Sequence, residues 1–185
     1  MLTRRAFWFL RHGETDWNAR NLSQGNIDIP LNEVGRAQAI TASKLLRNRG
    51  IRTIVSSPLS RAQDTAKAAA AEIGGQITLD EELREVSFGE QEGQPMGDWY
   101  DSWIAGDYLP DRAEPFADLK ARAVRALNRA LEGESPVLVV AHGALFRAVR
   151  AAMGLEPNVR TPNATPFFCE PGRTPDDPWT LTPAS

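Results

Sequence analysis

The chain has 185 residues, which is enough for a domain with a substantial hydrophobic core. Its 21 basic and 24 acidic residues give a net charge of −3, so no basic field indicates a nucleic-acid partner. Cys169 is the one cysteine, which excludes an internal disulfide, and no apolar run approaches the roughly 20 residues that span a bilayer. We expect a soluble cytoplasmic protein, folded as a single domain over residues 1–185, with neither a nucleic-acid nor a membrane partner.

The N-terminal part of the chain predicts a buried strand that ends in polar side chains. Residues 6–10 form a short apolar run, and residues 11–18 follow it at once with Arg-His-Gly-Glu-Thr-Asp-Trp-Asn. Gly13 carries no side chain, so we expect the backbone there to approach a ligand closely. Residues 19–30 are polar and irregular and predict a loop.

Two helices and a strand are expected next. The first helix runs from an Asn32 cap to about residue 48, and residues 51–55 form the strand. The second helix has Ser57 as its cap and Pro58 at its first position, and it ends at residues 74–75. The buried stripes predicted for the two helices are Val34, Ala37, Thr41 and Leu45 for the first, and Leu59, Ala62, Ala66, Ala69 and Ile73 for the second.

The second half of the chain continues the alternation of strands and helices. An excursion over residues 94–114, rich in Gly, Pro and aromatic residues, interrupts it, and its aromatic side chains are expected to pack rather than to stack on a base. The remaining expected elements are a strand at 76–79, a helix from about 115 to a stop at Gly133, a strand at 137–141, a helix at 143–153, and weak strands at 165–169 and 179–181.

This alternation predicts an α/β protein of three layers, in which helices flank a mostly parallel sheet and the excursion covers one edge. Ligands of such sheets bind beyond the carboxyl ends of the strands. The side chains expected together at that edge, each shortly after a predicted strand, are Arg11, His12, Arg61, Glu85 and His142.

These residue types suit the chemistry of phosphate esters. Arginine forks and helix N-termini bind phosphate oxygens, and Asn18 can donate a further hydrogen bond. A neutral imidazole is a competent nucleophile toward phosphorus, and a carboxylic acid can protonate the leaving alkoxide. The chain has no GxxxxGK[ST] loop and no carboxylates at metal spacing, so we expect neither a metal nor a cofactor.

The order of these motifs resembles that of a known family. Residues 11–15, with Asn18 three further on, are similar to the signature of the histidine phosphatase superfamily, the phosphoglycerate mutase-like proteins. Four later stretches resemble further features of that family in the same order, at residues 28–39, 56–66, 83–89 and 141–143. The resemblance covers residues 6 to about 154, and it implies the α/β fold of the family.

The resemblance also implies roles for individual residues. His12 would be the nucleophile that becomes a phosphohistidine, and Glu85 would donate the proton to the leaving group. The phosphate pocket would consist of Arg11, Arg61, His142 and Asn18.

Further polar residues and glycines lie close to these motifs in the sequence. Gln24, Gly25 and Gly143 are candidates for contact with the substrate, although an ordinary loop explains the first two equally well. Arg147 follows His142 on the same predicted helix and is expected at the surface, as is Arg150.

The departures from the family pattern bear on the reaction. The longer insertion of the true mutases is missing, and the excursion has few cations beyond Arg112, so residues that would hold a second phosphate group are not evident. We therefore expect a metal-independent phosphatase that acts on a small phosphorylated metabolite or a phosphoprotein. A phosphoglycerate mutase is the alternative, and a phosphate-binding module without catalysis ranks below both.

Overall fold

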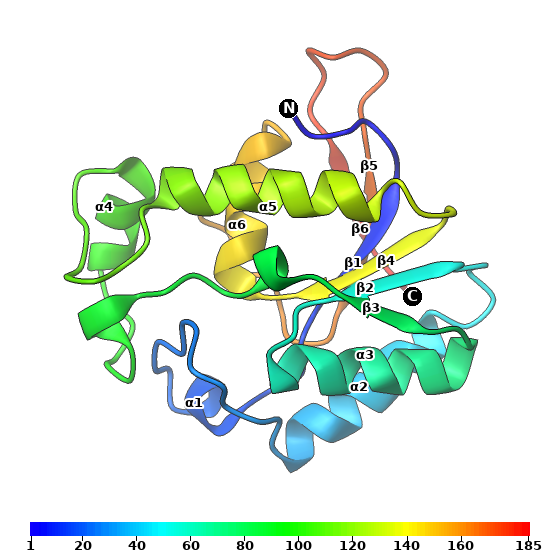
Figure 1. Ribbon diagram of the computed structural model, residues 1–185, viewed down its shortest axis with the longest axis horizontal. Coiled ribbons are helices and arrows are strands. Elements are labelled where there is room, and N and C mark those ends of the chain that lie inside the picture. Colours follow the sequence, from blue (N-terminus) through cyan, green and yellow to red (C-terminus); the bar gives the residue numbers. More distant parts are fainter.

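The computed structural model describes residues 1–185 and has helices on both faces of one six-stranded sheet (Figure 1). The strand order is β3-β2-β4-β1-β5-β6; the first four strands are parallel, and β5 runs antiparallel to both of its neighbours, β1 and β6. This architecture confirms the predicted fold class. The strands are β1 (Phe7–Arg11), β2 (Thr53–Ser56), β3 (Ile77–Leu79), β4 (Val137–Ala141), β5 (Pro166–Glu170) and β6 (Thr180–Pro183).

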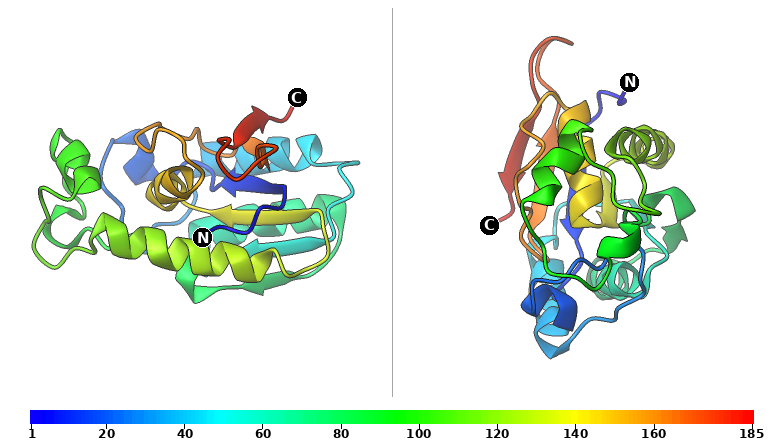
Figure 2. Two further views of the ribbon diagram at one scale, coloured as in Figure 1. Left: turned by 90° about the horizontal axis from the view of Figure 1, so that it is seen from above. Right: turned by 90° about the vertical axis from the view of Figure 1, so that its left-hand side faces the viewer.

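The helices form the two outer layers, with α5 and α6 on one face of the sheet and α2 and α3 on the other (Figures 1 and 2). None of them is both long and apolar enough to cross a membrane. The helices are α1 (Asp16–Ala19), α2 (Glu33–Leu45), α3 (Ser60–Ile73), α4 (Trp99–Ala105), α5 (Phe116–Ala130) and α6 (Gly143–Ala152), with two short 3₁₀ turns, η1 (Glu81–Leu83) and η2 (Gly89–Gln91).

Alternation along the central strands produces the two hydrophobic cores. In β1, Phe7 and Phe9 point toward α5 and α6, whereas Trp8 and Leu10 point toward α2 and α3. Phe9 stacks on Phe146 of α6 with ring centroids 3.9 Å apart. Both faces of β1 and β4 are buried, which is why these strands are apolar throughout.

The predicted buried stripe of α2 is wrong. Val34 is 52% exposed, and the residues that pack inward are smaller or lie further round the helix: Gly35, Ala39, Ala42, Ser43 and Leu46. The reason is a backbone contact at the start of the helix. A Cβ atom on Gly13 would lie 2.4 Å from the carbonyl oxygen of Gly35, so the absence of side chains fixes which face of α2 turns inward. Gly13 therefore serves this contact.

The predicted start of α3 is also displaced. The helix begins at Ser60 rather than Pro58, and its cap comes from a distant loop, because the carboxylate of Asp28 accepts hydrogen bonds from the Ser60 backbone N–H (2.8 Å) and hydroxyl (2.7 Å). The hydroxyl of Ser57 accepts the N–H of Leu59 (3.2 Å) but lies one turn too early to cap the helix.

Two other regions were only partly predicted. The excursion over residues 94–114 contains α4, which the sequence did not predict, and it lies at the same end of the molecule as α1, on the left in Figure 1. The weak strands of the tail are present as β5 and β6, and β5 pairs with β1. That pairing returns residues 160–164 to the edge where β1 ends, because Ala164 N–H donates to the carbonyl of Arg11 (2.9 Å).

The contact between Gly13 and Gly35 generates a prediction about stability. Gly13→Ala should lower the free energy of unfolding by about 1–3 kcal/mol, because a new methyl group must displace backbone atoms that cannot rotate away. Urea unfolding of the purified variant measures this difference. The control is Gly97→Ala, where a new Cβ would make an ordinary 3.4 Å contact with Trp99 and where a change within about 0.5 kcal/mol is expected. Equal stability of the two variants would contradict this account of the contact.

Candidate active site

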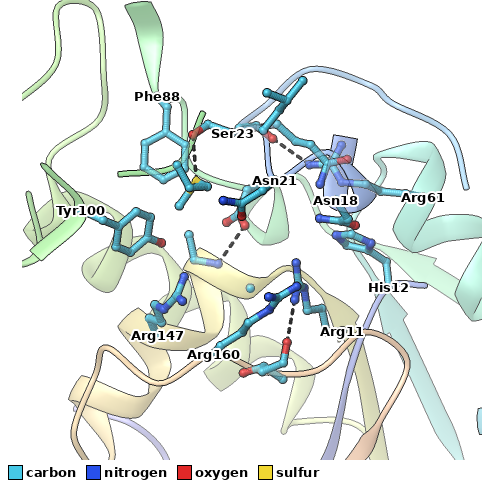
Figure 3. Close-up of a pocket in the computed structure, with 18 residues that line it drawn as sticks. Arg11, His12, Asn18, Asn21, Ser23, Arg61, Phe88, Tyr100, Arg147 and Arg160 are labelled. Atoms are coloured by element: carbon cyan, nitrogen blue, oxygen red, sulfur yellow. Dashed lines mark hydrogen bonds between the residues drawn. The ribbon is translucent and has the colours of Figure 1, made fainter. Parts of the chain in front are cut away.

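A polar pocket lies at the carboxyl ends of the parallel strands (Figure 3). It encloses a cavity of about 230 Å³, which suits a small phosphate ester. The sequence-predicted residues that line it are Arg11, His12, Asn18, Gln24, Gly25, Arg61, Glu85 and Gly143. His142 does not line the cavity and lies behind His12, with the two ring centroids 5.3 Å apart.

His12 is held in one tautomer. It follows directly on β1, and its Nδ1 lies 2.7 Å from the carbonyl oxygen of Gly13. A carbonyl oxygen can only accept a hydrogen bond, so Nδ1 carries the proton and Nε2 keeps its lone pair. The tautomer that a nucleophilic histidine needs is thus fixed by the backbone of the next residue.

The surroundings keep this imidazole neutral. Burial lowers the pKa of His12 well below 6.5, and the charges of Arg61 and Arg11 lower it further. The pKa of His142 is lowered for the same reasons, first by burial and then by Arg61. Burial also lowers the pKa of both arginines, to about 10, so that they stay charged at neutral pH.

Each arginine is anchored by carbonyl groups instead of carboxylates. The two terminal nitrogens of Arg61 donate to the carbonyls of Ile27 (2.6 Å) and Gly25 (2.7 Å), and Arg11 donates to the carbonyl of Thr161 (2.6 Å). The Nε atoms of both arginines are buried and have no partner. A neutral anchor fixes the side chain without a direct ion pair, so that only more distant carboxylates such as Glu85 act on its charge, which favours an anion in the pocket.

Asn18 presents its amide nitrogen to the pocket because its oxygen is already in use. It is the third residue of α1, and its Oδ1 accepts the N–H of Thr15 (3.2 Å) while the Thr15 hydroxyl accepts the N–H of Asn18 (3.1 Å). This reciprocal pair is a capping box. Gln24 is tied to the same residue, since its side-chain oxygen accepts the Thr15 hydroxyl.

The carboxylate of Glu85 binds the N-terminus of α6. Its Oε1 accepts the backbone N–H groups of Val86 (3.0 Å) and Leu145 (2.9 Å), and its Oε2 accepts that of Ala144 (2.9 Å). Oε1 therefore has both lone pairs engaged, whereas Oε2 has one left. Oε2 is accordingly the oxygen that can carry a proton toward the cavity.

Arg122 on α5 holds the chain segment that leads to Glu85. Its guanidinium donates to the carbonyls of Glu82 (2.8 Å), Arg84 (2.6 Å) and Glu85 (3.2 Å), and it pairs with both carboxylate oxygens of Glu114 (2.7 and 2.8 Å). All three guanidinium nitrogens are thus engaged, and the two terminal ones bind the irregular segment of residues 82–85. The sequence did not predict this role, because Arg122 lies 37 positions from Glu85 and looks like any helix arginine.

Comparison with known proteins agrees with this geometry. The model of the histidine phosphatase superfamily (branch 1) matches residues 7–163. The chain belongs to that superfamily. The resemblance inferred from the motifs of the sequence is therefore confirmed.

Relatives in the superfamily carry both phosphatase and mutase names. A probable phosphoglycerate mutase from Yersinia enterocolitica is 36% identical over 82% of this chain and 76% of its own length. A glucosyl-3-phosphoglycerate phosphatase from Mycolicibacterium vanbaalenii is 32% identical, over 80% of this chain and 74% of its own. A mycobacterial glucosyl-3-phosphoglycerate phosphatase solved with VO₃ superposes with a TM-score of 0.84 at 30% identity, covering 98% of this chain and all of that one.

In this member of the superfamily, several residues support the pocket in roles that were not predicted from the sequence. Ser57 lies 2.7 Å from His142 Nε2, and Thr65 accepts the backbone N–H of Gly13 (3.1 Å). Asn163, from the tail, donates to the carbonyl of His12 (3.0 Å). Each reaches the site through tertiary folding, and only its hydroxyl or amide group could have marked it as a candidate.

The expectation that Arg147 lies at the surface is wrong. Arg147 lines the pocket, together with Arg160 from the loop that follows α6. Its guanidinium carbon lies 4.6 Å from the centroid of the Tyr100 ring, and its Nε is buried without a partner. Arg150 does point away from the pocket, with its Nε donating to the carbonyl of Glu156 (2.7 Å).

The environment of the two histidines generates a prediction that nuclear magnetic resonance can test. Because the chain has only two histidines, a sample labelled with ¹⁵N shows two imidazoles. Both should be neutral at pH 6.5, where a histidine in water is half protonated, since their pKa values are lowered and protonation begins only as the pH falls well below that value. His12 should show the Nδ1–H tautomer. A His12 ring that is half charged at pH 6.5, or protonated on Nε2 alone, would contradict this assignment.

Proposed function

We propose that this chain hydrolyses the phosphomonoester of a small metabolite through a phosphohistidine at His12, with no metal ion. The observation that carries the proposal is the free Nε2 of a neutral His12 in the same cavity as two charged arginines that no carboxylate neutralises. A cavity of about 230 Å³ favours a small metabolite over a phosphoprotein segment. The phosphatase names among the relatives support the same reaction.

The reaction follows from these positions. His12 Nε2 attacks phosphorus, the bond from phosphorus to the ester oxygen breaks, and the proton on Glu85 Oε2 passes to the departing alkoxide. A water molecule then attacks the phosphohistidine and gives its proton to Glu85. Inorganic phosphate leaves, and His12 is again neutral.

The charge of the transferred group is stabilised by side chains. Arg11, Arg61 and the amide of Asn18 are proposed to bind the phosphoryl oxygens, together with the backbone N–H of Gly143 at the start of α6. A Cβ on Gly143 would lie 3.1 Å from Arg11 Nε, so glycine leaves room for that arginine. His142 is proposed to support His12 from behind, held in place by Ser57.

A labelled ester tests the covalent step. Wild-type protein quenched during turnover of a ³²P-labelled phosphomonoester should carry label that is lost in acid and retained in base, as expected of a phosphohistidine. The same protein carrying His12→Ala should carry no label and should lose turnover. EDTA should leave the wild-type rate unchanged, because arginine and imidazole groups bind the phosphoryl oxygens. Undiminished turnover by His12→Ala would mean that another group is the nucleophile.

The fate of the label separates the two enzyme classes. The name of the Yersinia relative favours phosphoglycerate mutase as the second candidate function. With labelled 3-phosphoglycerate as donor, a phosphatase releases the label as inorganic phosphate, whereas a mutase returns it to a phosphoglycerate isomer. We expect inorganic phosphate to predominate even when bisphosphoglycerate is added. Fast isomerisation would replace the proposed function by the mutase.

The acid role of Glu85 predicts a dependence on the leaving group. Glu85→Gln should slow phosphorylation of His12 by ~10²–10⁴-fold with alkyl phosphates, whose alkoxide needs a proton, and far less with p-nitrophenyl phosphate, whose phenolate leaves without one. The comparison is made on the first half-reaction in a single turnover, because Glu85 also activates water later.

Folding of this variant needs its own control. The substitution places an NH₂ group against the N–H of Ala144. Urea unfolding of Glu85→Gln is therefore measured in parallel, and its free energy of unfolding should be about 1–3 kcal/mol lower than that of the wild type. Structural damage slows both esters alike, whereas loss of the acid slows the alkyl ester selectively. Equal slowing of both esters would remove Glu85 from the acid role.

A further inference from the structure

The side of the pocket away from His12 carries a second group of cations. Arg147 and Tyr100 lie there, with Arg160 between them and Arg11 (Figure 3). This group could not be predicted from the sequence, because Arg147 comes from α6, Tyr100 from α4 and Arg160 from the loop after α6. The proposed transfer of a phosphoryl group uses neither Arg147 nor Arg160.

Arg147 is held in place on one face. Its guanidinium stacks over the Tyr100 ring at 4.6 Å, and this ring packs in turn against Phe88 (5.7 Å), Trp99 (5.5 Å) and Trp103 (5.1 Å between centroids). This cation–π contact uses none of the hydrogen-bond donors of the guanidinium, and the buried Nε of Arg147 has no partner. An arginine fixed in this way has less conformational entropy to lose on binding than a surface arginine.

No acidic group neutralises these two arginines. The ion pairs of the protein involve neither Arg147 nor Arg160, and the buried Nε of Arg147 has no hydrogen-bond partner. The charges of Arg147 and Arg160 also act on Arg11. Burial has the largest effect on the pKa of Arg11, and together with these two charges it lowers that pKa to about 10, whereas Glu85 raises it. Arg160 is exposed and hydrated, whereas Arg147 is half-buried, so a bound anion would stabilise the charge of Arg147 in particular.

The charges of the pocket exceed what one phosphate group needs. Four arginines line it, and Glu85 is its one carboxylate, which must be protonated to act as an acid. A phosphate dianion at His12 then balances two of the four arginine charges, those proposed for Arg11 and Arg61. The charges of Arg147 and Arg160 remain for another anionic group.

We propose that Arg147 and Arg160 form a second anion subsite, and that the substrate is a short phosphomonoester bearing a second anionic group, either a carboxylate or another phosphate. The inference rests on the proposed function in placing the reacting phosphoryl group at His12. The small cavity requires that the two anionic groups belong to one compact molecule. Tyr100 is a positioning residue, acting through Arg147.

Three esters on one carbon skeleton test the subsite. Glycerol 3-phosphate has a neutral CH₂OH group where 3-phosphoglycerate has a carboxylate and glycerol 1,3-bisphosphate has a phosphate. Both 3-phosphoglycerate and glycerol 1,3-bisphosphate carry a second anionic group. For at least one of them, the wild-type kcat/KM should be about tenfold to a hundredfold higher than for glycerol 3-phosphate. Which of them is preferred identifies the second anion. Equal kcat/KM for all three would overturn the proposal.

Substitution then assigns the preference to residues. Arg147→Gln and Arg160→Gln should each reduce the preference for the second anion by about tenfold, and Tyr100→Leu should reduce it through loss of the stacking. Arg52→Gln is the matched control, since it removes an exposed arginine that pairs with Glu134 outside the pocket, and it should keep the wild-type preference. If Arg147→Gln lowered kcat/KM equally for all three esters, its role would be structural and the subsite would be refuted.

Binding separates this inference from the proposed function. Calorimetric titration of the His12→Ala protein with the three esters reports the subsite without any turnover. If the wild-type protein hydrolysed none of the esters, nor p-nitrophenyl phosphate, the proposed function would fail, and the titration would still decide the subsite. Tighter binding of the anionic esters, lost in the Arg147→Gln, His12→Ala double variant, supports it, and equal affinity for all three refutes it.

Discussion

The site depends on burying positive charge without neutralising it. Arg61 is fully buried beside His12 and His142, and its terminal nitrogens meet two carbonyl groups. A carboxylate partner would stabilise the guanidinium further but would cancel the charge that a phosphate group must meet. Carbonyl dipoles satisfy the N–H groups and leave the net charge in place, so the protein holds a cation ready for an anion.

The anchoring of Arg61 by backbone carbonyl groups also orders the loop after α1. The carbonyls that accept from Arg61 belong to Gly25 and Ile27, and Asp28 from the same loop caps α3, in which Arg61 lies. The loop and the helix therefore fix each other. A second consequence falls on the histidines, because uncompensated arginines help to lower the pKa of His12 and so keep the nucleophile neutral.

Local signals account for what could be predicted from the sequence. The apolar runs of β1 and β4 are buried as expected, and the groups that end these strands lie at one edge because parallel strands share a direction. The four motifs belong to this local class. Each consists of residues near one another in the chain, so their spacing was visible without the fold.

What could not be predicted depends on contacts between distant segments. The buried face of α2 is set by a backbone contact between Gly13 and Gly35, which hydrophobic periodicity does not register. Arg147 was assigned to the surface because polar residues on helices usually lie there, and only the position of Tyr100 in α4 shows that its guanidinium is stacked over an aromatic ring. Asn163 reaches His12 because β5 pairs antiparallel with β1, a pairing that a weak strand signal did not indicate.

This division between local and distant signals coincides with a division of labour in the proposed site. The groups proposed for phosphoryl transfer lie at the carboxyl ends of the parallel strands, and they belong to the sequence motifs. The groups proposed to recognise the rest of the substrate come from α4, the second turn of α6 and the loop before β5. Tyr100 and Arg147 contact each other through side chains alone, whereas the loop before β5 is also joined to the end of β1 by the hydrogen bond from the Ala164 N–H to the Arg11 carbonyl. Relatives of this chain bear phosphatase and mutase names alike, as expected if the walls of the pocket, rather than its catalytic floor, select the substrate.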